Sequence, residues 1–199
     1  TRELQTLQPD VIALQELNPV SCVSRLLADS LGYDVIYQRA NGGIKIGRLG
    51  IPWNFNEGLA ILARKQLHLE LVDVWHLSTS FGTFGNGLSF HFSEQNIALV
   101  GKIQFEQTTI YVINAHLIAN VRADSTTLGK MSQIAAAESK NITDELRTFI
   151  EDSGTRLRQV IILTNHISSR LGDAHFVLLG DFNAPASDPE ILYLTDEKK

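Results

Sequence analysis

The segment that most constrains this chain is Phe176–Ala184, which reads Phe-Val-Leu-Leu-Gly-Asp-Phe-Asn-Ala. Its uncharged apolar run, Phe176–Leu179, predicts a strand that is buried on both faces. Asp181 and Asn183 follow this run two residues apart, and in extended backbone such residues project to the same side. The carboxylate and the amide should therefore meet at the mouth of the strand. An Asp-Asn turn that merely ends a strand would give the same pattern, because such turns are common.

Two further apolar segments also end in polar side chains. The strand predicted over Val11–Leu14 delivers Glu16 at its carboxyl end, where an unpaired buried carboxylate would be costly. Glu16 therefore either reaches solvent or serves as a ligand for Mg²⁺, which prefers one or two carboxylates with waters completing its shell. The strand predicted over Thr109–Leu117 places Asn114 and His116 on one face. A lone histidine there is more often a satisfied core residue, but three such strand ends favour a shared site.

The rest of the sequence interleaves strands with helices, which is the pattern of a mixed α/β domain. Periodicity and capping residues predict helices over Arg2–Leu7, Asn18–Leu31, Asp124–Ile150 and Thr155–Leu171. Further strands are predicted over Tyr33–Gln38, Leu59–Leu62, Leu67–Leu77 and Ile97–Phe105, and the last of these forms a hairpin with Thr109–Leu117. The segment Asn41–Asn56 is rich in glycine and basic residues, so it is either a surface loop or a rim that faces a substrate.

Composition limits the class of protein. With 199 residues, 44% of them hydrophobic and 20% charged, the chain is expected to form one soluble domain over residues 1–199. No apolar run is long enough to span a bilayer, and the single cysteine excludes a disulfide framework within the chain. The net charge of −5 and the lack of a basic run argue against tight DNA binding, although a local patch could coexist with them. A cytoplasmic location is slightly favoured, and the oligomeric state stays open.

Four stretches stand in order along the chain: Pro9–Glu16, Asn56–Leu62, Ile113–Leu117 and Leu179–Ala184. They resemble the successive motifs of the endonuclease/exonuclease/phosphatase superfamily, the group of deoxyribonuclease I, exonuclease III, neutral sphingomyelinases and inositol polyphosphate 5-phosphatases. The resemblance implies an α/β (α+β) fold of the deoxyribonuclease I type, a four-layer αββα sandwich. It also implies Mg²⁺-dependent hydrolysis of phosphoesters, with Mn²⁺ as the alternative metal. The substrate would be a phosphodiester, in a nucleic acid or in a phospholipid headgroup.

The resemblance further assigns roles to the polar strand ends. It implies that Glu16 binds the metal and that His116 contacts the scissile phosphate and stabilises its developing charge. It implies that Asp181 orients or deprotonates the attacking water, while Asn183 holds Asp181 and the phosphate in register. Asn114 is a lower-ranked assistant. The carboxylates of Glu16 and Asp181 should then lie within several ångströms of each other at one sheet edge, beside His116.

Two elements typical of the superfamily are absent from the sequence. One is a first strand with a Thr-Trp-Asn-like motif, and the other is a closing Ser-Asp-His motif; no Asp-His pair occurs in the 199 residues. We therefore expect a domain truncated at both ends, which lacks its first and last strands, leaves apolar sheet surface uncovered and has weak or no activity by itself. The alternatives are a catalytically incomplete module that keeps the fold for binding, and an unrelated α/β domain.

Overall fold

The chain folds as an alternation of helices and strands in a computed structural model that describes residues 2–18, 22–40, 44–46, 49–51, 58–78, 82–83, 90–91, 96–119, 125–137 and 154–195. Its helices are α1 (Arg2–Leu7), α2 (Val23–Leu31), α3 (Ser125–Ala137), α5 (Thr155–Leu171) and α6 (Pro189–Thr195), with a 3₁₀ turn η1 (Lys65–Leu67). Its strands are β1 (Val11–Leu14), β2 (Tyr33–Arg39), β3 (Ile44–Ile46), β4 (Leu49–Ile51), β5 (Gly58–Arg64), β6 (Glu70–His76), β7 (Gly82–Thr83), β8 (Phe90–His91), β9 (Ile97–Phe105), β10 (Thr108–His116) and β11 (Phe176–Asp181).

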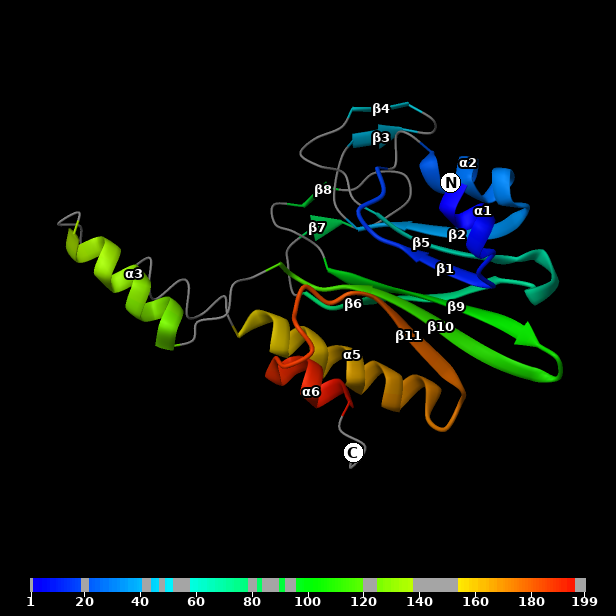
Figure 1. The fold of residues 1–199 in the computed structure, drawn as a ribbon. Helices are drawn as coiled ribbons and strands as arrows, with labels where there is room; N and C mark the ends of the chain where they lie inside the picture. The colour runs from blue at the N-terminus through cyan, green and yellow to red at the C-terminus, as the bar shows by residue number, and fades with distance from the viewer. Residues whose placement is uncertain are drawn as a thin grey trace.

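Two β-sheets form the middle of the molecule (Figure 1). The first has the strand order β1-β5-β2 with antiparallel pairs. The second has the order β11-β10-β9-β6, in which β11 runs parallel to β10 and the other pairs are antiparallel. Helices α1 and α2 cover the outer face of the first sheet, and α5 and α6 cover the outer face of the second. The layers therefore follow the order helix, sheet, sheet, helix, which confirms the predicted αββα sandwich.

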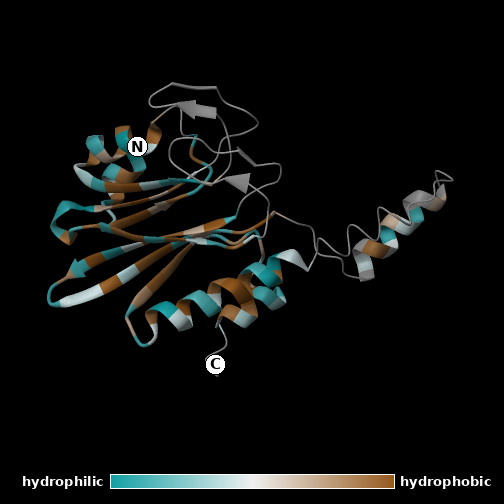
Figure 2. Ribbon diagram, turned by 180° about the vertical axis from the view of Figure 1, so that it is seen from behind, coloured by the Kyte–Doolittle hydropathy of each residue, from teal (hydrophilic) through white to brown (hydrophobic). Residues whose placement is uncertain are grey.

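The core between the sheets is built from alternate residues of their central strands. In β5, Leu59, Ile61 and Ala63 pack in the cluster between the sheets, whereas Ala60 and Leu62 pack against the outer helices. Successive side chains of a strand alternate between faces, so β5 is buried on both and reads as a continuous apolar run. Apolar residues follow these inner strands in Figure 2. The stacked sheets thereby fix the strand ends on which the site is built.

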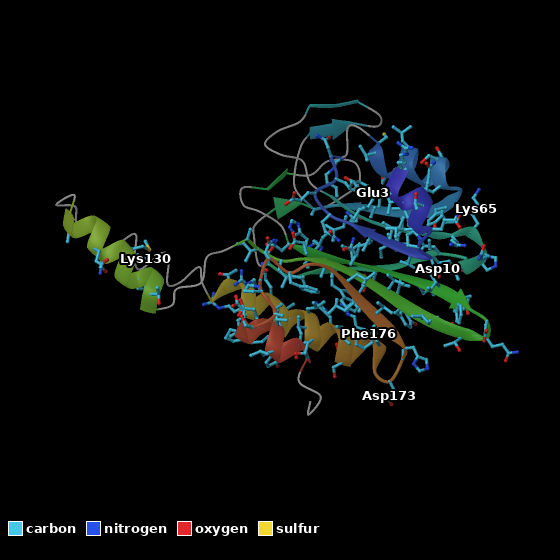
Figure 3. The ribbon with its side chains drawn as sticks, viewed as in Figure 1. Glu3, Asp10, Lys65, Lys130, Asp173 and Phe176 are labelled. Carbon is cyan, nitrogen blue, oxygen red and sulfur yellow. The ribbon has the colours of Figure 1, made fainter. Side chains whose placement is uncertain are left out.

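Strand β11 has the predicted position but not the predicted burial. Phe176 and Val177 are 41% and 46% exposed, although a fully buried strand was expected. Within the described residues β11 pairs with β10 along one side only, so its start, marked by Phe176 in Figure 3, lies at a sheet edge. Leu178 and Leu179 do pack, one toward α5 and the other between the sheets. The apolar run therefore reflects an edge strand in which only the middle residues, Leu178 and Leu179, are partly buried.

The helices also show where periodicity misled. Helix α2 begins at Val23 rather than near residue 18, and its apolar residues Val23 and Leu26 are 43% and 66% exposed, although helical periodicity would bury them. Helix α5 has the predicted bounds, but its apolar residues Leu157 and Ile161 are exposed. The helix predicted over residues 124–150 is confirmed over 125–137, beyond which it lies outside the described residues, as does most of the segment 41–56. None of the described helices is long and apolar enough to cross a membrane.

Candidate functional site

The ends of β1, β10 and β11 bring polar side chains together at one edge of the paired sheets. His116 is the last residue of β10, is 6% exposed and lies opposite Asp181 in the β10–β11 register. Its Nε2 atom is 3.9 Å from Oε1 of Glu16, whose side chain is 66% exposed. A buried imidazole and an accessible carboxylate are therefore neighbours, although they come from different sheets.

Glu16 reaches His116 through a turn, not as a continuation of β1. Alternation along an extended strand predicts that Leu14 and Glu16 share one face, and this prediction is wrong. Leu14 packs against the outer helices, whereas Glu16 has a φ of 55° and points toward the second sheet. The backbone amide of Leu17 then donates to the carbonyl of Gly58 at 3.0 Å, which ties the turn to β5. A left-handed residue thus swings the carboxylate away from the helical layer.

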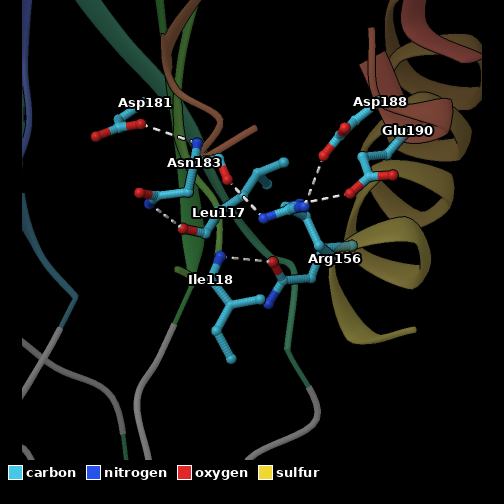
Figure 4. A network of polar contacts seen from close by, with 8 residues as sticks. Leu117, Ile118, Arg156, Asp181, Asn183, Asp188 and Glu190 are labelled. Carbon is cyan, nitrogen blue, oxygen red and sulfur yellow. Dashed lines mark hydrogen bonds and ion pairs between the residues drawn. The ribbon is translucent and has the colours of Figure 1, made fainter. Parts of the chain in front are cut away.

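Asn183 connects His116 to Asp181. Figure 4 shows its bonds to Asp181 and to the carbonyl of Leu117. Its side-chain nitrogen lies 3.3 Å from Nε2 of His116 and donates to the carbonyl of Leu117 at 2.8 Å. Its backbone amide donates to Oδ1 of Asp181 at 2.9 Å. Asp181 and Asn183 therefore do form a local Asx-type turn, and this turn is also what aims the amide of Asn183 at the histidine. Phe182 between them packs against the apolar cluster beneath the second sheet.

Gly180 sets how closely β11 approaches β10 at the site. It has a φ of 141°, and a Cβ atom placed there would lie 1.8 Å from the carbonyl oxygen of Ala115. Ala115 and Gly180 are register partners, immediately before the pair His116 and Asp181. Both the backbone conformation and the space therefore require glycine at this position. Sequence reasoning marked Gly180 as the end of an apolar run and missed this role.

Asn114 bridges the two sheets beneath the site. It is fully buried, and its side-chain nitrogen donates to the carbonyls of Leu14 and Ala60, each at 2.9 Å. Its side-chain oxygen accepts a hydrogen bond of 2.6 Å from Nε2 of Gln15, the residue before Glu16. With these bonds Asn114 supports the β1 end and is not directed at a ligand. Sequence reasoning missed Gln15, whose only signal was its place beside Glu16.

Arg156 and Gln159, in the first turns of α5, are two further buried polar residues at the site, and sequence reasoning missed both. Arg156 is 3% exposed, and its guanidinium donates to the carbonyl of Asn183 at 2.5 Å. Gln159 is 1% exposed, and its side-chain oxygen accepts from the backbone amide of Ile118 at 3.0 Å. Figure 4 shows both contacts. In the sequence nothing distinguishes Arg156 from Arg158, which is exposed on the same helix.

The donor set fits a hard divalent cation with few protein ligands. The accessible carboxylate of Glu16 is the sort of oxygen ligand that Mg²⁺ takes, and Mg²⁺ commonly completes its shell with waters and substrate phosphate oxygens. Within the part of the chain that the structure describes, no group of three or more His, Cys, Asp or Glu side chains could hold a metal by itself.

Comparison with known proteins identifies the fold. No protein-family model matches the sequence, and no curated protein matches it at a significant level. An endonuclease/exonuclease/phosphatase from Bacteroides vulgatus matches with a TM-score of 0.61 and 15% identity, over 99% of this chain and 60% of that one. ANGEL2, a 2',3'-cyclic phosphatase, matches with a TM-score of 0.59 and 20% identity, over 97% of this chain and 45% of that one. The mannosyl-6-phosphatase of Bacteroides thetaiotaomicron matches with a TM-score of 0.59 and 15% identity, over 98% and 58%. The chain thus spans about half of the length of these structures.

Proposed function

We propose that this chain, which has the fold of the endonuclease/exonuclease/phosphatase superfamily, forms the core of a metal-dependent hydrolase of phosphoester bonds. The observation that carries the proposal is the contact of His116 with both Glu16 and Asn183, with Asp181 holding Asn183 from the other side. Hydrolysis of a phosphoester needs a carboxylate and hydrogen-bond donors such as imidazole and amide groups. Here these groups lie together at the ends of three separate strands.

Each residue has a proposed role that follows from the chemistry of a phosphoester. The substrate is anionic and repels hydroxide, so its charge must be neutralised and a water must be aimed in line with the leaving group. A bound Mg²⁺ supplies charge neutralisation and polarises a phosphate oxygen. Glu16 would hold it, while His116 and the amide of Asn183 donate to equatorial oxygens. Asp181, exposed at the end of β11, would orient or deprotonate the attacking water.

We propose a phosphodiester as the substrate class, in a nucleic acid or a phospholipid headgroup. The net charge of −5 weakens the case for a general nuclease, because such enzymes track a polyanion over many phosphates. The solved structures with this fold include a cyclic phosphatase and a sugar phosphatase, so the fold by itself is compatible with several phosphate esters. A compact headgroup or a short phosphodiester is the substrate that best suits an acidic protein.

The second candidate is a non-catalytic module that binds phosphoesters with the same residues. One observation favours it: no Asp-His pair occurs in the 199 residues of the sequence. Under the first proposal, the missing catalytic elements belong to a longer protein that contains this chain. Under the second, they are absent from the whole protein.

Hydrolysis of bis-p-nitrophenyl phosphate in Mg²⁺ or Mn²⁺ separates the candidates, measured for the complete protein and for residues 1–199 side by side. We expect the complete protein to be active, chelator to abolish its activity, and Glu16→Gln and Asp181→Asn each to lower kcat by about a hundredfold or more. Glu106→Gln and Asp173→Asn, at exposed turn positions, are the matched controls and should leave kcat unchanged. A folded complete protein that binds phosphodiesters without hydrolysing them would support the binding module instead.

Metal binding is tested separately from activity. Titration of residues 1–199 with Mn²⁺, followed by water proton relaxation, should show binding that Glu16→Gln weakens at least about tenfold and Glu106→Gln does not. Equal binding by the parent chain and Glu16→Gln would remove Glu16 from the metal-ligand role.

A further inference from the structure

The first two turns of α5 carry two buried polar side chains, Arg156 and Gln159. One binds the segment that follows β11, and the other binds the segment that follows β10. Arg156 and Gln159 are three residues apart, so they share one helical face, which packs against the ends of β10 and β11. They are 3% and 1% exposed. Polar groups buried this deeply are costly unless every one is matched, so their position calls for a reason.

Arg156 fastens the segment that follows β11. Its guanidinium donates to the carbonyl of Asn183 at 2.5 Å, to Oδ2 of Asp188 at 3.1 Å and to Oε1 of Glu190 at 2.5 Å. The side chains of Arg156 and of its two ionic partners, Asp188 and Glu190, are at most 11% exposed. One planar guanidinium thus fixes three points of the chain between Asn183 and the first turn of α6. A lysine could not do this, because its ammonium lacks the fixed fork.

The contact at Asn183 is the one that reaches the candidate site. Asn183 has a φ of 49°, and its side chain lies 3.3 Å from Nε2 of His116. The bond from Arg156 to the Asn183 carbonyl fixes the peptide plane after this left-handed residue. This peptide plane and the side chain of Asn183 are attached to the same Cα atom. Fixing the carbonyl therefore also restricts the direction in which the side-chain amide points.

Gln159 binds the segment that follows β10. Its side-chain oxygen accepts from the amide of Ile118 at 3.0 Å, and its nitrogen donates to Oδ1 of Asn96 at 2.9 Å. Asn96 in turn donates to the carbonyl of His116 at 3.3 Å. The backbone on both sides of Leu117 is therefore tied, directly or through Asn96, to the same helix that holds Asn183.

We propose that Arg156, supported by Gln159, is a positioning residue that sets the His116–Asn183 geometry through the carbonyl of Asn183. This inference rests on the proposed function for its catalytic consequence, and on the structure for the geometry itself. A buried ion cluster is a poor source of stability, because apolar residues of similar volume are often as stable. Apolar residues would not fix the Asn183 carbonyl, and misplacing a reacting group by about 1 Å can cost a hundredfold in rate.

Two variants test the proposal by nuclear magnetic resonance on residues 1–199, without need of activity. Arg156→Lys keeps the charge but loses the fork, and the triple variant Arg156→Met, Asp188→Leu, Glu190→Met replaces the whole ion cluster with apolar side chains. Both are expected to lose the nuclear Overhauser contact between the Asn183 side-chain amide and the His116 ring. The triple variant should keep its melting temperature within about 5 °C of the parent. Arg158→Met, on the exposed face of the same helix, is the control and should keep the contact.

Kinetics on the complete protein supply the second readout. We expect kcat to fall about tenfold to a hundredfold in the folded Arg156 variants, with KM changed by less than about threefold. An intact amide–imidazole contact in either folded variant would overturn the proposal. If the complete protein proves inactive, the resonance experiment still decides the positioning role, so failure of the proposed function and failure of this inference remain distinct.

Discussion

The side-chain amide nitrogen of Asn183 lies 3.3 Å from Nε2 of His116. His116 ends β10 and Asn183 follows β11, so the two residues are 67 positions apart in the chain. The parallel pairing of β10 with β11 explains this contact, because it sets His116 opposite Asp181. Asn183 follows Asp181 by two residues, in the turn that its backbone amide forms with the Asp181 carboxylate. A parallel connection needs a crossover, and α5 is part of the crossover segment between β10 and β11. This segment therefore also supplies Arg156, which holds the two strand ends together.

Replacing Asn183 by glycine and by alanine separates its side chain from its backbone. Both variants lose the bond to the carbonyl of Leu117, but only alanine is strained at a φ of 49°. We expect Asn183→Gly to be about 1 kcal/mol more stable than Asn183→Ala, because glycine adopts this conformation freely. Hydrolysis by the complete protein should fall about a hundredfold in both. Chemical denaturation and kcat measure the two effects, and equal stability of the variants would contradict the strain argument.

Gly180→Ala is expected to lower the free energy of unfolding by at least about 3 kcal/mol, because its Cβ atom would collide with a backbone carbonyl that cannot move aside. The collision is with Ala115, at 1.8 Å, and the φ of 141° adds strain. Gly129→Ala in α3 is the matched control, since among the described residues no atom beyond its chain neighbours and its own helix backbone lies within 4 Å of the added Cβ. That change should raise helix stability by up to about 1 kcal/mol. Urea denaturation of both variants checks the contrast.

Sequence patterns predicted best where local chemistry decides the outcome. The β9–β10 hairpin, the bounds of α5 and β1 and the alternation of β10 follow from periodicity and turn residues, and the structure confirms them. Alternation also predicted that Asn114 and His116 share one face of their strand, and both are buried. Four motifs in order then identified the fold, because each lies at a strand end whose backbone the sheet constrains.

The failures concern properties that depend on distant parts of the chain. Burial of Phe176 cannot be predicted from an apolar run, because it depends on what pairs with the outer edge of β11. Arg156 is buried because it meets Asp188, just before α6, and Glu190, in the first turn of α6, while Arg158 on the same helix is exposed. The turn at Glu16 likewise comes from the return of the chain to β5. Each miss is a tertiary contact that overrides a local pattern.

Asn114→Leu should destabilise the domain by about 2–4 kcal/mol, because it leaves two carbonyls at the sheet interface without the donor they now share. The same change removes the partner of Gln15 and should free the turn that carries Glu16. Gln104→Leu is the control: Gln104 is exposed, and its bond to Thr109 should be worth less than about 0.5 kcal/mol. Thermal denaturation measures stability, and Mn²⁺ titration measures the effect on Glu16. Unchanged Mn²⁺ affinity in a folded Asn114→Leu would contradict the link from Asn114 to Glu16.

The contact between α5 and β6 predicts how stability depends on pH. His166 stacks on Trp75 with ring centroids 5.3 Å apart, and the pKa of His166 is lowered from its ordinary 6.5, first by burial and then by the charge of Arg170. A histidine whose folded pKa lies below its unfolded value binds more protons when unfolded, so its stabilising contribution is complete above pH 6.5 and is lost as the pH falls below it.

The melting temperature should therefore drop between pH 7 and pH 5, and His166→Phe should make this drop shallower because phenylalanine keeps the stacking without titrating. His175→Gln, at an exposed position, should leave the slope unchanged. The same slope in His166→Phe as in the parent would assign the acid sensitivity to other groups.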